Sequence, residues 1–138
     1  MKKIITSVLV GLAILGTVLN ISSCGKEESK PPLIEFWKST SSTTYISKDT
    51  SLVHGTVFNI GINAAKTGTE GLLTSLKISR SINGAPDSTL LQANFIYQYF
   101  SQVYSYAAGD SGNLEKYTFT IGEQDGGSNS VSVLITDI

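Results

Sequence analysis

The chain has 138 residues, with 10 lysines and arginines, 11 aspartates and glutamates, one histidine and one cysteine. This length suits one domain with a single hydrophobic core. The near-neutral charge and the absence of a basic patch argue against nucleic acid as a partner. A single cysteine excludes an internal disulfide or a cysteine-based metal centre, so the fold depends on its apolar core.

The first 24 residues have the three parts of a secretory signal. Two lysines precede a nearly continuous apolar run over residues 4–19, and Ile21-Ser22-Ser23-Cys24 follows. This ending closely resembles the bacterial lipobox, which places an aliphatic and two small residues before an acylated cysteine. A retained transmembrane helix is the weaker interpretation, because it needs about 20 apolar residues. An ordinary cleaved signal with an unrelated cysteine is the other alternative.

The lipobox resemblance implies cleavage between Ser23 and Cys24 and acylation of the Cys24 thiol with a diacylglyceryl group and palmitate-type chains. One acyl chain anchors a protein only reversibly, whereas two or three hold it on the membrane. No cofactor other than these acyl chains is expected. The chain is then divided into a signal peptide at 1–23, an acylated tether at 24–32 and a folded domain at 33–138.

The residues after the cysteine also resemble a known signal. Lys26-Glu27-Glu28 is similar to the short basic-acidic sequence that directs lipoproteins of Bacteroidetes-type bacteria to the outer face of the outer membrane. The resemblance implies a lipid anchor in the outer membrane and display on the cell surface. The alternatives are a simple solvated tether and the inner leaflet of that membrane.

The folded domain has the pattern of an all-β protein, with alternating apolar and polar residues between Gly-, Asn- and Asp-rich breaks. Residues 48–51 are predicted to form a turn, and residues 45–47 are a candidate short strand. Residues 90–106 fit either a short helix or two strands, and their aromatic and β-branched content favours strands at 88–96 and 100–107. The other expected strands cover residues 33–38, 56–64, 72–80, 117–121 and 131–135.

Period two also assigns the inward faces of these strands. In the 56–64 strand the inward side chains are Phe58, Ile60, Ile62 and Ala64. In the 72–80 strand they are Leu72, Leu76 and Ile78. Seven or eight such strands without intervening helices predict a single antiparallel β-sandwich.

The last two strands resemble the closing pair of immunoglobulin-like domains in bacterial surface lipoproteins. Residues 115–121 read Glu-Lys-Tyr-Thr-Phe-Thr-Ile, and an Asp-Gly turn and an alternating Ser/Val strand at 130–135 follow. The resemblance implies an Ig-like β-sandwich, with Tyr117 in the place of a tyrosine corner whose hydroxyl bonds to nearby backbone. The disulfide and paired tryptophan of antibody domains are missing.

The sequence contains no catalytic or metal-binding pattern. His54 is the only histidine and has no partner at a metal-ligand spacing. The acidic loops at 110–113 and 125–129 carry oxygen ligands, but they lack the order of a known calcium loop and suit plain turns. We therefore expect neither an enzyme nor a metal protein.

Aromatic residues crowd into residues 95–106, and alternation cannot bury them all on one face. The tyrosines Tyr97, Tyr99, Tyr104 and Tyr106 are candidate contacts for a glycan or protein ligand, although packing in the core is the plainer interpretation for most of these rings. The sequence thus predicts a lipid-anchored, non-enzymatic binding module. A structural or assembly subunit facing the periplasm is the alternative.

Overall fold

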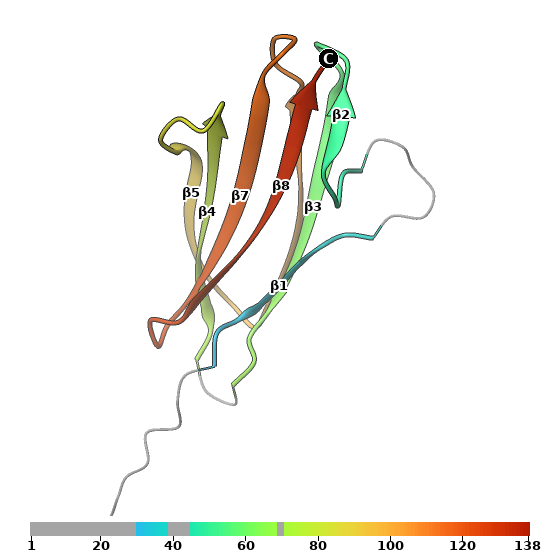
Figure 1. The fold of residues 1–138 in the computed structure, drawn as a ribbon. Helices are drawn as coiled ribbons and strands as arrows, with labels where there is room; N and C mark the ends of the chain where they lie inside the picture. The colour runs from blue at the N-terminus through green and yellow to red at the C-terminus, as the bar shows by residue number, and fades with distance from the viewer. Residues whose placement is uncertain (1–29, 39–44, 69–70) are drawn as a thin grey trace, which may run out of the picture.

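The computed structural model describes residues 30–38, 45–68 and 71–138. In these residues the chain forms eight β-strands and no helix, in two sheets that face each other. Figure 1 shows the strands running along the length of the body. The expected all-β fold and strand number are confirmed. The predicted signal peptide, the lipidation site Cys24 and the export signal at Lys26–Glu28 lie outside the described residues.

The strands follow one another through short connections, and the expected strands are all present with slightly different bounds. The elements are β1 (Leu33–Phe36), β2 (Thr50–Leu52), β3 (Val57–Ala65), β4 (Leu73–Ile82), β5 (Ser88–Tyr97), β6 (Tyr99–Ala107), β7 (Leu114–Glu123) and β8 (Ser128–Asp137). The ambiguous aromatic segment is two strands, as its composition favoured, with only Gln98 between them.

One sheet has three strands in the order β1-β3-β6, and the other has five in the order β2-β8-β7-β4-β5. The consecutive strands β5 and β6 belong to different sheets, so the chain crosses between the layers at Gln98. The rings of Phe95 and Phe100 stack across this crossing with centroids 4.8 Å apart. β5 is an edge strand of one sheet and β6 is an edge strand of the other. No strand of the described residues closes the side of the sandwich between these two edges.

The expectation of a wholly antiparallel sandwich is wrong for one strand. β2 pairs in parallel with the end of β8, and Thr50 and Ser51 lie in β2 although they were predicted to be part of a turn. The Oδ1 atom of Asp49 accepts a hydrogen bond from the Leu134 backbone N–H at 2.9 Å. This bond extends the contact with β8 to the residue that precedes β2. Because β8 is the last strand of the chain, no local pattern near residue 50 reveals this partner.

The other uncertain segment, residues 45–47, does not form a strand. Tyr45 makes a single parallel bridge to Asn59 of β3, and Ile46 donates a backbone hydrogen bond to the same residue.

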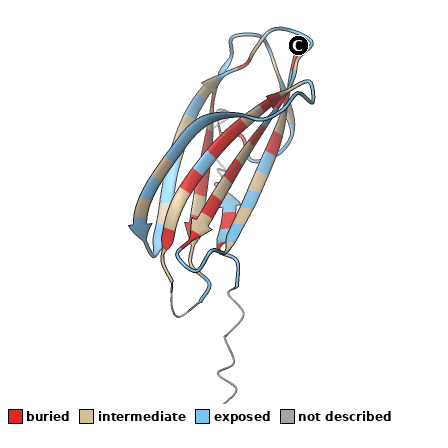
Figure 2. Cartoon of the chain, turned by 90° about the vertical axis from the view of Figure 1, so that its left-hand side faces the viewer, coloured by how far each residue is buried: buried red, intermediate tan, exposed pale blue. Residues whose placement is uncertain are grey.

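The core lies between the two sheets and is built from the inward side chains of β3, β4, β7 and β8. Figure 2 shows the resulting alternation of buried and exposed residues along the strands. The predicted inward face of β3 is confirmed, and in β7 and β8 the alternating apolar residues also point inward. The buried apolar side chains are Ile34, Ile46, Phe58, Ile60, Ile62, Ala64, Leu73, Leu76, Ile78, Ala108, Tyr117, Phe119, Ile121, Val133 and Ile135.

The inward face of β4 differs from the prediction at its start. Leu73 is fully buried, whereas Leu72 is only partly buried and precedes the strand. The register of β4 shifts between Leu73 and Ser75 against both of its neighbours. This bulge inserts a residue and reverses the phase of the alternation, so an odd-numbered leucine joins Leu76 and Ile78 in the core.

The two ends of the sandwich differ in what they present. At one end the chain enters β1, and the loop from β3 to β4 and the β7–β8 turn lie beside this entry. We call this the tether end. At the opposite end, the far end, lie the loops at residues 53–56, 83–87 and 108–113 and the carboxyl end of β8.

The bulge in β4 predicts unequal effects for two neighbouring leucines. Leu73→Ala should lower the free energy of unfolding by about 2–5 kcal/mol, because it empties a dry position in the core. Leu72→Ala should lower it much less, because this side chain is partly exposed. Urea unfolding followed by circular dichroism measures both, and an equal loss in the two variants would contradict the bulged register.

Candidate functional site

The four tyrosines expected to contact a ligand are divided between different surfaces. Tyr97 and Tyr99 face solvent and are 54% and 57% exposed. Tyr104 and Tyr106 are partly buried and pack against the core. The reason is the period of β6, because even positions point between the sheets and odd positions point outward.

The inward pair behaves as part of the core. Tyr106 lies 4.7 Å from Tyr117 between ring centroids, and Tyr104 lies 6.0 Å from Phe119. Burial raises the pKa of Tyr106 to about 12, with a smaller contribution from Tyr104, and burial also raises the pKa of Tyr104 itself. These phenols therefore keep their protons and fill the open side of the sandwich. Their role as ligand contacts stays a prediction.

A polar aromatic surface lies on the outer face of the three-stranded sheet. We call it the aromatic–amide patch and define it as Trp37, Tyr45, Asn63, Tyr99 and Ser101. The Asn63 side-chain oxygen accepts three hydrogen bonds, from Trp37 Nε1 at 2.7 Å, the Tyr99 hydroxyl at 2.9 Å and Ser101 Oγ at 2.8 Å. Three donors fix the orientation of this amide, and none of the described residues accepts a hydrogen bond from its Nδ2.

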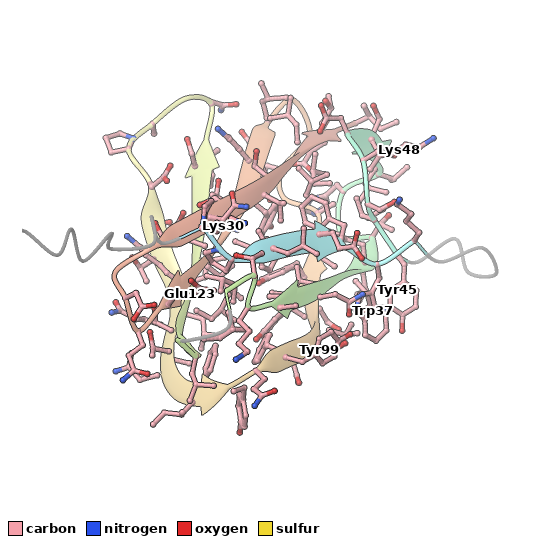
Figure 3. All side chains as sticks on the ribbon, turned by 90° about the horizontal axis from the view of Figure 1, so that it is seen from below. Lys30, Trp37, Tyr45, Lys48, Tyr99 and Glu123 are labelled. Carbon is pink, nitrogen blue, oxygen red and sulfur yellow. The ribbon has the colours of Figure 1, made fainter. Side chains whose placement is uncertain are left out.

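Trp37 is held flat against the backbone of β3. A Cβ atom added to Gly61 would lie 2.6 Å from the indole ring, so only glycine allows this approach. The ring of Tyr45 stacks on Trp37 at a centroid distance of 5.9 Å and an interplanar angle of 17°. Figure 3 shows Trp37 and Tyr45 side by side, with Tyr99 nearby, as seen from the tether end.

Sequence reasoning did not single out Trp37, Tyr45 or Asn63. The available signal was Gly61 between Asn59 and Asn63 at the outward positions of β3, because a glycine inside a strand indicates a close approach. A second amide–hydroxyl pair, Asn59 and Ser105, continues the polar row on the same face. The surface can therefore offer ring edges, amide N–H groups and hydroxyls to a polar ligand.

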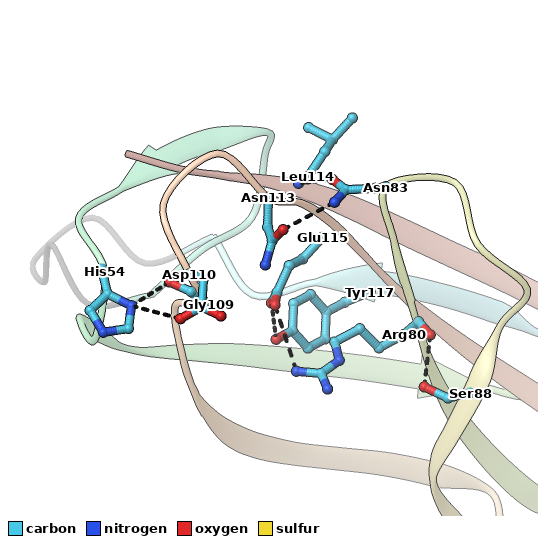
Figure 4. A network of polar contacts seen from close by, with 10 residues as sticks. All are labelled: His54, Arg80, Asn83, Ser88, Gly109, Asp110, Asn113, Leu114, Glu115 and Tyr117. Atoms are coloured by element: carbon cyan, nitrogen blue, oxygen red, sulfur yellow. Dashed lines mark hydrogen bonds and ion pairs between the residues drawn. The ribbon is translucent and has the colours of Figure 1, made fainter.

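Two buried carboxylates meet near the far end. Glu115 on β7 and Asp137 on β8 are each 1% exposed. An added Cβ on Gly109 would lie 2.5 Å from a Glu115 oxygen and 3.1 Å from an Asp137 oxygen, so both carboxylates face the same glycine. Figure 4 shows Glu115 with its two partners, the Tyr117 hydroxyl and the Arg80 guanidinium, and Arg80 Nη1 lies 3.7 Å from Glu115 Oε1.

The Tyr117 hydroxyl corrects one expectation. It donates to Glu115 Oε2 at 2.7 Å, and not to nearby backbone as a tyrosine corner would. The ring is fully buried, and its pKa lies well above 10 because of burial and then the bond to Glu115. A carboxylate two residues away on the same strand face is a closer acceptor than the backbone.

Asp137 is less well compensated than Glu115. Neither of its carboxylate oxygens has a hydrogen-bond partner among the described residues. Burial raises the pKa of Asp137, the charge of Glu115 raises it further, and the Gly109 amide and His54 oppose the shift in part. The closed position of both acids makes them unsuitable for contact with a substrate.

His54 lies in an exposed loop beside this pair. Its Nδ1–H donates to the Gly109 carbonyl at 2.7 Å, and Nδ1 is 3.9 Å from a carboxylate oxygen of Asp110. Among the residues that the structure describes, no three histidine, cysteine or acidic side chains are grouped to hold a metal ion.

The comparisons with known proteins supply no relative. No family model matches the chain, and no curated protein matches it. Within the described part of the chain, no helix has the length and apolar character required to cross a bilayer. The chemistry of the residues themselves is therefore the basis for a functional proposal.

The raised pKa of Asp137 predicts that Asp137→Asn stabilises the protein at pH 7. The unfolded carboxyl titrates near 3.9, and the native one titrates higher, so the charged form opposes folding above that range. The gain should disappear as the pH falls through the native pKa toward about 3.9. Thermal unfolding from pH 3 to 8 tests this, with Glu35→Gln at an exposed carboxyl as the control. Destabilisation by Asp137→Asn at pH 7 would contradict it.

Proposed function

We propose that the chain is a lipid-anchored binding protein of the cell envelope, attached to the outer membrane through Cys24 and displayed on the cell surface of a Bacteroidetes-type bacterium. The observation that carries the proposal is the sequence Ile21-Ser22-Ser23-Cys24 at the end of an apolar leader. An acylated cysteine at this place is followed directly by a compact β-body. A lipid anchor joined to a small β-sandwich is suited to a binding module that is displayed on a membrane surface.

The finer fold that we propose is Ig-like. With β1, β3 and β6 as strands A, B and E, and β8, β7 and β4 as G, F and C, the two sheets have the partition of that fold. β5 then takes the position of C′, which joins the GFC sheet in variable-type domains. This strand order supports the resemblance that the closing hairpin suggested, although Tyr117 bonds differently.

For the ligand, we propose a neutral glycan that binds the aromatic–amide patch. A glycan presents many hydroxyls and apolar C–H faces, and the patch presents an exposed tyrosine, amide N–H groups and serine hydroxyls. The three hydrogen bonds to Asn63 hold these groups in place before binding, which reduces the ordering needed on association.

A binding role is favoured over catalysis because the buried carboxylates are closed to solvent and general acids must reach the proton that they transfer. The alternative of a periplasm-facing structural subunit is separated from surface display by the first experiment below.

The anchor predicts that radiolabelled palmitate enters the wild-type protein and fails to enter Cys24→Ser. Protease added to intact cells of the host should then digest the wild-type domain without lysis. Digestion only after lysis would support the periplasm-facing alternative, and an unmodified Cys24 thiol by mass spectrometry would contradict the anchor itself.

The patch predicts different effects for two similarly exposed tyrosines. On an array of neutral oligosaccharides, Tyr99→Ala should weaken binding by about tenfold or more, because truncating an aromatic hot-spot residue costs about 2 kcal/mol or more and about 1.4 kcal/mol corresponds to tenfold. Tyr97→Ala is the matched control, since its ring is as exposed but lies outside the patch. Equal binding by both variants, or no binding by the wild-type protein, would contradict the glycan proposal.

A further inference from the structure

We propose that the tether end of the body rests on the lipid bilayer, with Ile96 and Tyr97 in the headgroup region. This inference rests on the proposed acylation of Cys24 and adds a second, non-covalent contact with the membrane. We call the contact surface the lower rim and define it as Leu33, Ile96 and Tyr97.

The length of chain between the anchor and the body limits where the body can lie. Only Gly25–Ser29 separate Cys24 from Lys30, the first described residue. Even a fully extended chain spans at most about 3.6 Å per residue, so Lys30 lies within roughly 20 Å of the acylated cysteine. A ten-residue strand such as β7 is about 33 Å long, so the far end is about one strand length away from the tether end. The far end could come closer to the anchor than the tether end only if the whole body tipped over toward the membrane.

The entry of the chain is also tied to the tether end. Thr67 Oγ1 donates to the carbonyl oxygens of Lys30 and Pro31, at 3.1 and 2.9 Å. The side-chain amide of Asn129, at the start of β8, donates to the Pro32 carbonyl at 2.9 Å. These bonds connect the last tether residues to the β3–β4 loop and to β8. The chain therefore enters the body at a fixed position at the tether end.

The lower rim has the chemistry that suits the bilayer interface. Ile96 is 70% exposed, Tyr97 is 54% exposed and Leu33 is 53% exposed. Tyrosine is favoured at the membrane surface because its ring is apolar and its hydroxyl is polar. Ile96 and Tyr97 are adjacent at the end of β5, and Leu33 begins β1 at the same end of the sandwich. Tyr99, a member of the aromatic–amide patch, begins β6 two residues after Tyr97.

Among the residues that the structure describes, few charged side chains lie around the rim. Lys30 is exposed at the entry of the chain, Lys66 follows β3 and donates its backbone N–H to the Gln98 carbonyl next to Tyr97, and Asp125 is exposed in the β7–β8 turn. Glu123 is nearly buried beside the entry, close to Pro31 and Lys30. β5 itself has no charged residue, so placing Ile96 and Tyr97 in the headgroup region desolvates no charged side chain of that strand.

Exposed apolar residues also occur at the far end, where Val53 and Val57 are 61% and 63% exposed. Exposure alone does not select the rim, and the short tether does. These valines consequently provide controls that match the rim residues in exposure and differ in distance from the anchor.

Membrane contact at the rim sets the orientation of the proposed binding surface. The outer face of the β1-β3-β6 sheet runs along the length of the body from the tether end. A body standing on its rim holds this face roughly perpendicular to the bilayer. Tyr99 shares a cross-strand row with Leu33 of the rim through Ala65, so this edge of the aromatic–amide patch lies closest to the bilayer and the rest of the patch extends away from it.

The test uses the full acylated protein in phosphatidylcholine vesicles that contain lipids with a nitroxide quencher near the headgroup. Ile96→Cys and Val53→Cys are each labelled with an environment-sensitive fluorophore through the new thiol, since acylation blocks Cys24. The label at position 96 should lose most of its emission to the quencher and shift to the blue. The label at position 53 should keep its emission. Tyr97→Cys repeats the measurement in case Ile96→Cys fails to fold.

Flotation of the vesicles separates the two levels of the proposal. Protein that floats but shows equal quenching at positions 96 and 53 would overturn the rim contact and leave the anchor intact. Protein that does not float with the vesicles would overturn the anchor, and the rim contact with it.

Discussion

The structure depends on two sheets that stay together without a disulfide between them. The contact between them is an apolar layer in which Phe58, Phe119 and Tyr117 pack against smaller aliphatic side chains. The strands β3, β7 and β8 contribute to this layer through every second residue. Because the layer occupies one face of each sheet, everything else that the chain presents must lie on an outer face, at an edge or at an end.

This constraint explains the division of the tyrosines. In β6, even-numbered positions point between the sheets and odd-numbered positions point outward, so Tyr104 and Tyr106 pack on the open side of the core while Tyr99 faces solvent. The inward rings gain from burial, which also holds their protons. The outward ring is free to bond Asn63 and to join Trp37 in the aromatic–amide patch. One strand thus serves the core on one side and a polar surface on the other.

The two ends of the sandwich have different structural roles. The tether end receives the chain through backbone carbonyls of residues 30–32, which accept hydrogen bonds from Thr67 of the β3–β4 loop and Asn129 of β8. The far end closes over Glu115 and Asp137, and only Glu115 has close polar partners. A buried carboxylate without a hydrogen-bond partner lowers the free energy of unfolding at neutral pH. Asp137 therefore makes the far end a place where the fold is less stable than it could be.

The amino-acid sequence by itself determined seven of the eight strands and, in β3, which side chains point inward. This succeeded because period-two alternation and turn residues are local properties. Tertiary structure decided the rest. It placed β2 in parallel beside β8, moved Leu73 into the core through a bulge, and brought Trp37, Tyr45 and Tyr99 together around Asn63. These contacts join residues far apart in the chain, and their pairing depends on which strands become neighbours, which no local pattern contains.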